Sequence, residues 1–109
     1  MIICVDIDGT ICSKVENANY RNAVPFFDRI DRANELFDKG HRVIYWTARG
    51  SETGIDWEKL TKKQLAEWGV KYHEVIFGKP HYDIYIDDKS IRDTVLDSGE
   101  EIINATITV

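Results

Sequence analysis

The sequence predicts an α/β fold in which a mostly parallel sheet is flanked by helices. Short apolar runs at residues 1–5, 42–46, 73–77 and 82–86 are rich in β-branched or aromatic residues and are too short for helices. Longer stretches with helical spacing of apolar residues separate the first three runs. Strands that alternate with helices usually pair in parallel, so we expect one sheet with helical crossovers.

Each element has its own signal. Residues 1–5 read as a fully buried strand, and residues 11–24 as a polar connection. Pro25 fits the first turn of a helix that ends at Gly40, which suits a left-handed cap. Residues 57–68 show a weaker helical pattern. Ser90 is expected to cap a helical turn, and residues 102–109 to form an edge strand or a tail pairing with the sheet. The apolar face of the first helix consists of Phe26, Ile30, Ala33 and Phe37.

Length and composition set limits on the class of protein. The 109 residues fit one domain, residues 1–109, with one core. The net charge of −5 weighs against a nucleic-acid surface, which usually carries a basic stripe. No apolar run has the length of a membrane span, and the start of the chain does not resemble a signal peptide. Cys4 and Cys12 lack disulfide or metal spacing, so reduced thiols and a cytoplasmic location are expected.

Two carboxylates follow the first strand. Asp6 and Asp8 alternate with an apolar residue and should lie on the same side of the strand. Like charges this close repel unless one takes up a proton or a cation lies between them. Gly9 lets the backbone leave the strand by an unusual route, and Thr10 can hydrogen-bond back to the carboxylates. A plain Asp-Gly turn is the alternative reading.

Polar residues also end the other predicted strands. Thr47 follows the second, Lys79 the third, and Asp87-Asp88 the fourth. Ligands bind outside the carboxyl ends of parallel strands, so these groups should meet. The order D-x-D-G-T, T, K, DD resembles the four motifs of the haloacid dehalogenase (HAD) superfamily of phosphohydrolases. That resemblance implies a Rossmann-like fold. Residues 9–46 and 48–78 each hold only one loop and one helix, so it implies a member without a cap domain.

The resemblance also implies a role for each residue. Asp6 would be the nucleophile that forms an aspartyl-phosphate, and Asp8 the general acid and then the base, a role that needs a raised pKa. Thr47 would donate a hydrogen bond to a phosphoryl oxygen, and Lys79 would balance the charge on Asp6 and the phosphoryl group. The activity implied is phosphomonoester hydrolysis.

The implied cofactor is Mg²⁺, which requires oxygen ligands in octahedral geometry. Asp6, the backbone carbonyl of Asp8, and Asp87 fit that demand, with Asp88 as a direct or water-mediated partner. For Asp87 and Asp88, a solvated turn is the alternative. Asp93 is expected at the surface.

Candidate substrate-binding residues surround these motifs. Arg49 could bind a second anionic group of the substrate or simply face solvent. Two structures could cover the site: the 11–24 segment, folding over Asp6 as a lid, or a neighbouring subunit. Tyr20 and Arg21 lie in that segment and would face the substrate. The segment around Tyr20 and the Thr47-Ala48-Arg49 motif are similar to small capless phosphatase-like proteins associated with capsular polysaccharide synthesis, which suggests a small sugar phosphate or related metabolite. With Gly9 and Thr10, these residues complete the predicted substrate site.

Other functions remain open at this stage. A polynucleotide 3′-phosphatase would suit an open site but not the acidic charge. A receiver-like signalling module would use similar groups, but with the acidic pair first in the chain. An inactive phosphate-binding domain is the third alternative. Self-association through a patch of Trp46, Trp57 and Trp68, giving a homo-oligomer, is as open as a monomer.

Overall fold

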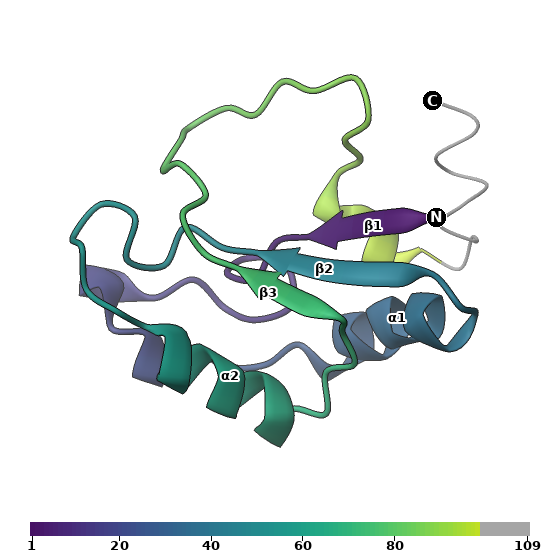
Figure 1. Ribbon diagram of the computed structural model, residues 1–109, viewed down its shortest axis with the longest axis horizontal. Helices are drawn as coiled ribbons and strands as arrows, with labels where there is room; N and C mark the ends of the chain where they lie inside the picture. The colour runs from purple at the N-terminus through teal and green to yellow at the C-terminus, as the bar shows by residue number, and fades with distance from the viewer. Residues whose placement is uncertain (99–109) are drawn as a thin grey trace.

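The computed structural model describes residues 1–98, which form an α/β fold built on a three-stranded parallel sheet. The strands β1 (Ile2–Val5), β2 (Arg42–Trp46) and β3 (Glu74–Ile76) lie in that order in the sheet. The helices α1 (Phe27–Asp38) and α2 (Glu58–Glu67) connect them (Figure 1). Three short 3₁₀ helices lie outside the sheet: η1 (Glu16–Ala18), η2 (Tyr20–Asn22) and η3 (Asp93–Asp97).

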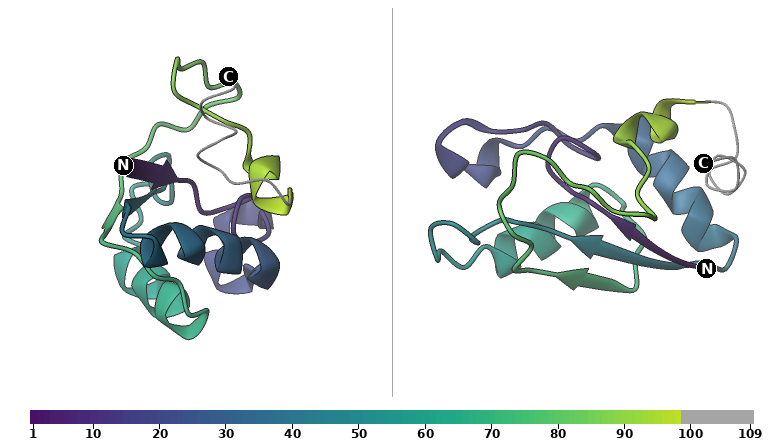
Figure 2. Two further views of the ribbon diagram at one scale, coloured as in Figure 1. Left: turned by 90° about the vertical axis from the view of Figure 1, so that its right-hand side faces the viewer. Right: turned by 90° about the horizontal axis from the view of Figure 1, so that it is seen from above.

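Both α-helices cover the same face of the sheet (Figures 1 and 2). Alternate residues of β2 point to this face, and Val43 and Tyr45 are fully buried there. They join Ile30 of α1 and Leu65 of α2 in one apolar cluster. The core therefore lies between the sheet and the helices, and it fixes the carboxyl ends of the strands at one edge of the molecule.

The opposite face of the sheet is open, which corrects the expectation of a fully buried first strand. Ile2 is 73% exposed, and the thiol-bearing Cys4 is also exposed. Ile3 and Val5 alternate with them and pack against the core. β1 is buried on one face because both helices lie on that side.

The predicted fourth strand at residues 82–86 is wrong for this structure. The segment runs outside the sheet, on the side away from α1 and α2 (Figures 1 and 2). Ile84 is 79% exposed and Ile86 is 93% exposed. Tyr82 and Tyr85 instead place their rings near the ammonium of Lys79. Among residues 1–98, β1 therefore pairs only with β2.

The other predicted helices and turns are present in the structure, but their caps and buried positions differ in part from the prediction. Gly40 ends α1 with φ +92°, as the left-handed cap requires. Pro25 lies before α1 and not in its first turn. Leu36 is buried on α1, while Phe26, expected on the buried face, is 38% exposed. Ser90 hydrogen-bonds the carbonyl of Asp87 and does not cap η3. The prediction for residues 102–109 lies outside the described residues.

The three tryptophans, which the sequence left open as a self-association patch, are largely covered in the structure. Trp57 is only 8% exposed, and Trp46 and Trp68 are half-buried. Within residues 1–98, no helix is long and apolar enough to cross a bilayer.

Candidate active site

The carboxyl ends of the strands bring three of the predicted residues together. Asp6 follows β1, Thr47 follows β2, and Lys79 lies three residues beyond β3. The Nζ atom of Lys79 lies 3.4 Å from a carboxylate oxygen of Asp6. The backbone N–H of Lys79 donates to the carbonyl of Thr47, which anchors the lysine to the end of β2. The parallel register thus produces a carboxylate and an ammonium in contact at the sheet edge.

Asp6 is a half-buried carboxylate with a free path to solvent, since its side chain is 36% exposed. The hydroxyl of Thr10 donates to its second oxygen at 3.4 Å, as the sequence predicted. Burial raises the pKa of Asp6 above its usual 3.8, although the ammonium of Lys79 and a backbone hydrogen bond at Ile7 act to lower it. Asp6 is therefore more basic than a surface aspartate.

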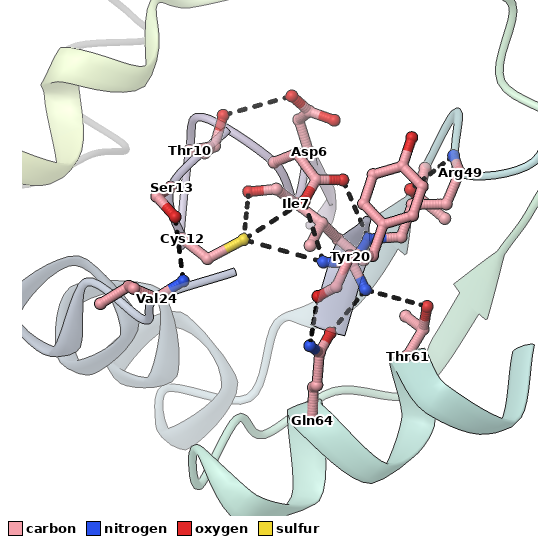
Figure 3. A network of polar contacts seen from close by, with 12 residues as sticks. Asp6, Ile7, Thr10, Cys12, Ser13, Tyr20, Val24, Arg49, Thr61 and Gln64 are labelled. Carbon is pink, nitrogen blue, oxygen red and sulfur yellow. Dashed lines mark hydrogen bonds and ion pairs between the residues drawn. The ribbon is translucent and has the colours of Figure 1, made fainter. Parts of the chain in front are cut away.

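Asp8 has a different cationic partner. Arg49 donates to both carboxylate oxygens of Asp8, from Nε and Nη2, each at 2.9 Å. The side chain of Arg49 is fully buried, and its Nη1 donates to Thr61 and Gln64 of α2 (Figure 3). Arg49 is therefore neither solvent-facing nor available to a second anionic group of a substrate, the two alternatives left by the sequence. From its buried position between Asp8 and α2, Arg49 orients the carboxylate of Asp8.

The repulsion between Asp6 and Asp8 is relieved by two separate cations. Lys79 lies against Asp6, and the bidentate guanidinium of Arg49 lies against Asp8. The sequence pattern left two solutions: one carboxylate takes up a proton, or a cation lies between the two. In the structure each carboxylate has its own fixed positive partner, so the two side chains are held in different environments.

Aromatic rings surround the ammonium of Lys79. Its Nζ lies 5.4 Å from the ring centre of Trp46, 5.1 Å from that of Tyr82 and 5.7 Å from that of Tyr85. Burial lowers the pKa of Lys79, but Asp6 and Tyr82 raise it by more, so the net pKa lies above its usual 10.5. Lys79 is therefore a permanent cation beside Asp6.

The loop after β1 has a conformation that glycine makes possible. Gly9 has φ +83°, and a Cβ at this position would lie 2.8 Å from Cε of Lys14. Arg29 of α1 donates to the carbonyls of Gly9 and Thr10. The same guanidinium pairs with Asp93 and Asp97 of η3. Asp93, expected at the surface, thus helps to hold the motif loop.

Thr47 and Ala48 lie at the site edge without facing open solvent. Thr47 is 1% exposed. Its hydroxyl accepts a hydrogen bond from the backbone N–H of Arg49. Ala48 is half-buried, and its carbonyl accepts from the backbone of Ser51. Both residues shape the turn that carries Arg49 under Asp8.

The 11–24 segment reaches the site through its second 3₁₀ helix. The ring of Tyr20 covers the guanidinium of Arg49, with 4.7 Å between the guanidinium carbon and the ring centre. Tyr20 also packs edge-on against Trp57, and Arg21 lies over the same indole at 5.2 Å. The segment is therefore docked on the start of α2, beside Asp8.

Asp87 and Asp88 are not gathered with the other carboxylates. Both are exposed, and Asp87 accepts from the hydroxyl of Tyr85 and the backbone N–H of Lys89. These bonds lower the pKa of Asp87. Among residues 1–98, no group of three or more His, Cys, Asp or Glu side chains could hold a metal ion. The predicted Mg²⁺ ligands, as placed here, do not fit that ion.

Comparisons with known proteins support the fold. No protein-family model and no curated protein matches the chain. The chain is similar to a crystal structure of an MCSG target from Vibrio cholerae, with 28% identity and a TM-score of 0.83. The match covers 98% of this chain and 96% of the other. The description of that structure names no activity, so the similarity supports the α/β architecture alone.

Sequence reasoning missed the residues that hold the charged groups in place. Thr61 and Gln64 are three residues apart on α2, and both are buried against Arg49. Their inward position explains why α2 gave a weak apolar pattern, and this weakness was the available signal. Arg29 gave no such signal, because a single arginine on a helix usually faces solvent.

Proposed function

We propose that the protein is a phosphomonoester hydrolase of the HAD type, with a capless Rossmann-like core. The observation that carries the proposal is the contact between the half-buried carboxylate of Asp6 and the ammonium of Lys79 at the carboxyl end of the sheet. A nucleophile beside a fixed cation suits attack on a phosphate dianion, whose negative charge otherwise repels the nucleophile.

In the proposed reaction, an oxygen of Asp6 attacks phosphorus, and the bond between phosphorus and the leaving oxygen breaks. Asp8 supplies the proton that the leaving oxygen takes up. Asp8 then accepts a proton from water, which attacks phosphorus and releases phosphate from Asp6. Lys79 balances the negative charge on the phosphoryl oxygens. Arg49 donates to both oxygens of Asp8 and so holds its carboxylate in one orientation.

Mg²⁺ belongs to the proposal through the resemblance alone. When bound, it would neutralise charge on the phosphoryl group. Because Asp87 and Asp88 lie on the exposed segment, they would have to approach Asp6 to take part. No step above depends on the ion.

The proposed substrate is a small sugar phosphate or related metabolite. Within residues 1–98 the site has no covering domain; the docked η2 segment borders it beside Asp8, and Tyr82 and Tyr85 border it beside Lys79. A compact substrate needs few contacts beyond its phosphate, which suits a site without a covering domain.

The test is phosphate release from a panel of sugar phosphates, nucleotides and phosphorylated 2-hydroxy acids, with and without Mg²⁺. Asp6→Asn should fall below about a hundredth of the wild-type rate, since the amide keeps the shape but cannot attack phosphorus. Asp31→Asn, at an exposed carboxylate of α1, is the matched control and should keep full activity. Near-normal turnover by Asp6→Asn would remove the basis of the proposal.

A further inference from the structure

The side-chain amide of Gln64 bonds both the guanidinium of Arg49 and the η2 segment. Its Oε1 accepts from Nη1 of Arg49 at 2.6 Å, and its Nε2 donates to the backbone carbonyl of Tyr20 at 2.7 Å (Figure 3). Gln64 is 6% exposed; its bond to Arg49 is buried, and its bond to the carbonyl of Tyr20 is partly buried. Buried amide groups are costly to leave unpaired, so both partners hold the glutamine in one orientation.

Tyr20 contacts Arg49 directly as well. The ring of Tyr20 lies over the guanidinium of Arg49, which also donates to Gln64. The backbone carbonyl of Tyr20 accepts from the same glutamine. Removing the η2 segment would therefore uncover the face of Arg49 and leave the Nε2 donor of Gln64 unpaired at the same time. Tyr20 and Gln64 therefore take part both in docking the η2 segment and in holding the guanidinium of Arg49.

We propose that Gln64 is a positioning residue that couples docking of the η2 segment to the orientation of the Arg49–Asp8 pair. The catalytic part of this inference rests on the proposed function. Arg49 holds the carboxylate of Asp8 in one orientation. In the proposed reaction, Asp8 activates the water that hydrolyses phosphorylated Asp6. A loosened Arg49 should slow this second step more than the first, because a good leaving group departs without help from an acid.

The test variant is Gln64→Met, which keeps a similar volume and removes both hydrogen bonds. Lys63→Met, at an adjacent side chain that is 72% exposed, is the matched control. Two measurements need no activity: the Nε–H signal of Arg49 in a ¹H–¹⁵N NMR spectrum, and the rate of tryptic cleavage after Arg21 in the native state.

In Gln64→Met the Arg49 signal should broaden or exchange rapidly with water. Cleavage after Arg21 should quicken about tenfold, the effect of losing one buried hydrogen bond on a local opening equilibrium. Both should be unchanged in Lys63→Met. An unaltered Arg49 signal and cleavage rate in Gln64→Met would overturn the coupling, whether or not the protein is a phosphatase.

The catalytic consequence is tested by stopped-flow kinetics with p-nitrophenyl phosphate. Gln64→Met should show a burst of p-nitrophenolate followed by a steady state about ten- to a hundredfold slower than wild type, the range for partners that orient an active group. A loss of burst amplitude in proportion to the rate would mean simple structural damage and would overturn the positioning role. Wild type without phosphatase activity would instead refute the proposed function, and the NMR and proteolysis results would still decide the coupling.

If Gln64→Met does not fold, Gln64→Glu replaces it. Glutamate keeps an acceptor for Arg49 and loses the donor to Tyr20. It should retain the Arg49 signal while cleavage after Arg21 quickens, and unchanged cleavage would overturn the inference.

Discussion

Replacing Arg49 with methionine should strongly destabilise the protein. The Arg49 side chain is fully buried and bonds both oxygens of Asp8, whose side chain is 21% exposed. Removing one partner of such a pair leaves a poorly solvated charge and costs about 3–5 kcal/mol. Thr61 and Gln64 would also each lose a hydrogen-bond donor. A domain of this size has a total free energy of unfolding of about 5–15 kcal/mol, so the loss is a large part of it.

The assay is urea unfolding followed by circular dichroism at neutral pH. Arg42→Met is the matched control, because Arg42 forms an exposed pair with Glu74 and should lose less than about 1 kcal/mol. Adding Asp8→Asn should reduce the cost of Arg49→Met, since the unpaired charge is then absent. A loss in Arg49→Met no greater than in Arg42→Met would refute the account of this pair.

Three further predictions concern other parts of the structure. Iodoacetamide at mildly alkaline pH should label exposed Cys4 in the native protein but not Cys12, whose burial and nearby Asp8 raise its pKa to about 12; equal labelling, read by mass spectrometry, would contradict the fold. Arg29 lowers the pKa of Asp97 below its usual 3.8, so the unfolded state binds more protons in acid and the free energy of unfolding falls as pH drops through that range. Asp97→Asn should weaken this acid dependence, and identical pH profiles of urea unfolding would exclude it. Mg²⁺ should slow amide hydrogen exchange in residues 82–86 if Asp87 approaches Asp6, and EDTA should reverse it; Mg²⁺-dependent activity without added protection would refute that movement.

The sequence predicted the elements that depend on local pattern. The β2 boundaries and the Gly40 cap follow from an apolar run and from glycine's access to positive φ, and both are confirmed. Residues 82–86 show the limit of that reasoning. An apolar run has the same composition whether it pairs in a sheet or lies outside it, and here Tyr82 and Tyr85 contact Lys79.

The sequence predicted which residues meet at the candidate site better than it predicted which side chains pair with one another there. Asp6 and Lys79 meet because parallel strands end at one edge, which the motif spacing implied. The partner of Asp8 was not predictable, because the burial of Arg49 depends on Thr61 and Gln64 turning inward on α2. The weak apolar pattern of α2 indicates polar residues turned inward, but it does not identify their partner.

The central claim is that Asp6 carries the phosphoryl group, and borohydride trapping tests it most directly. A reaction with a good substrate is quenched with sodium borohydride, which reduces an aspartyl-phosphate to homoserine, and the peptide containing residues 1–14 is sequenced by mass spectrometry. The account predicts homoserine at position 6, only when substrate is present, and none in Asp6→Asn. Turnover by the wild type with Asp6 unmodified, or with the reduction at Asp8, would contradict it.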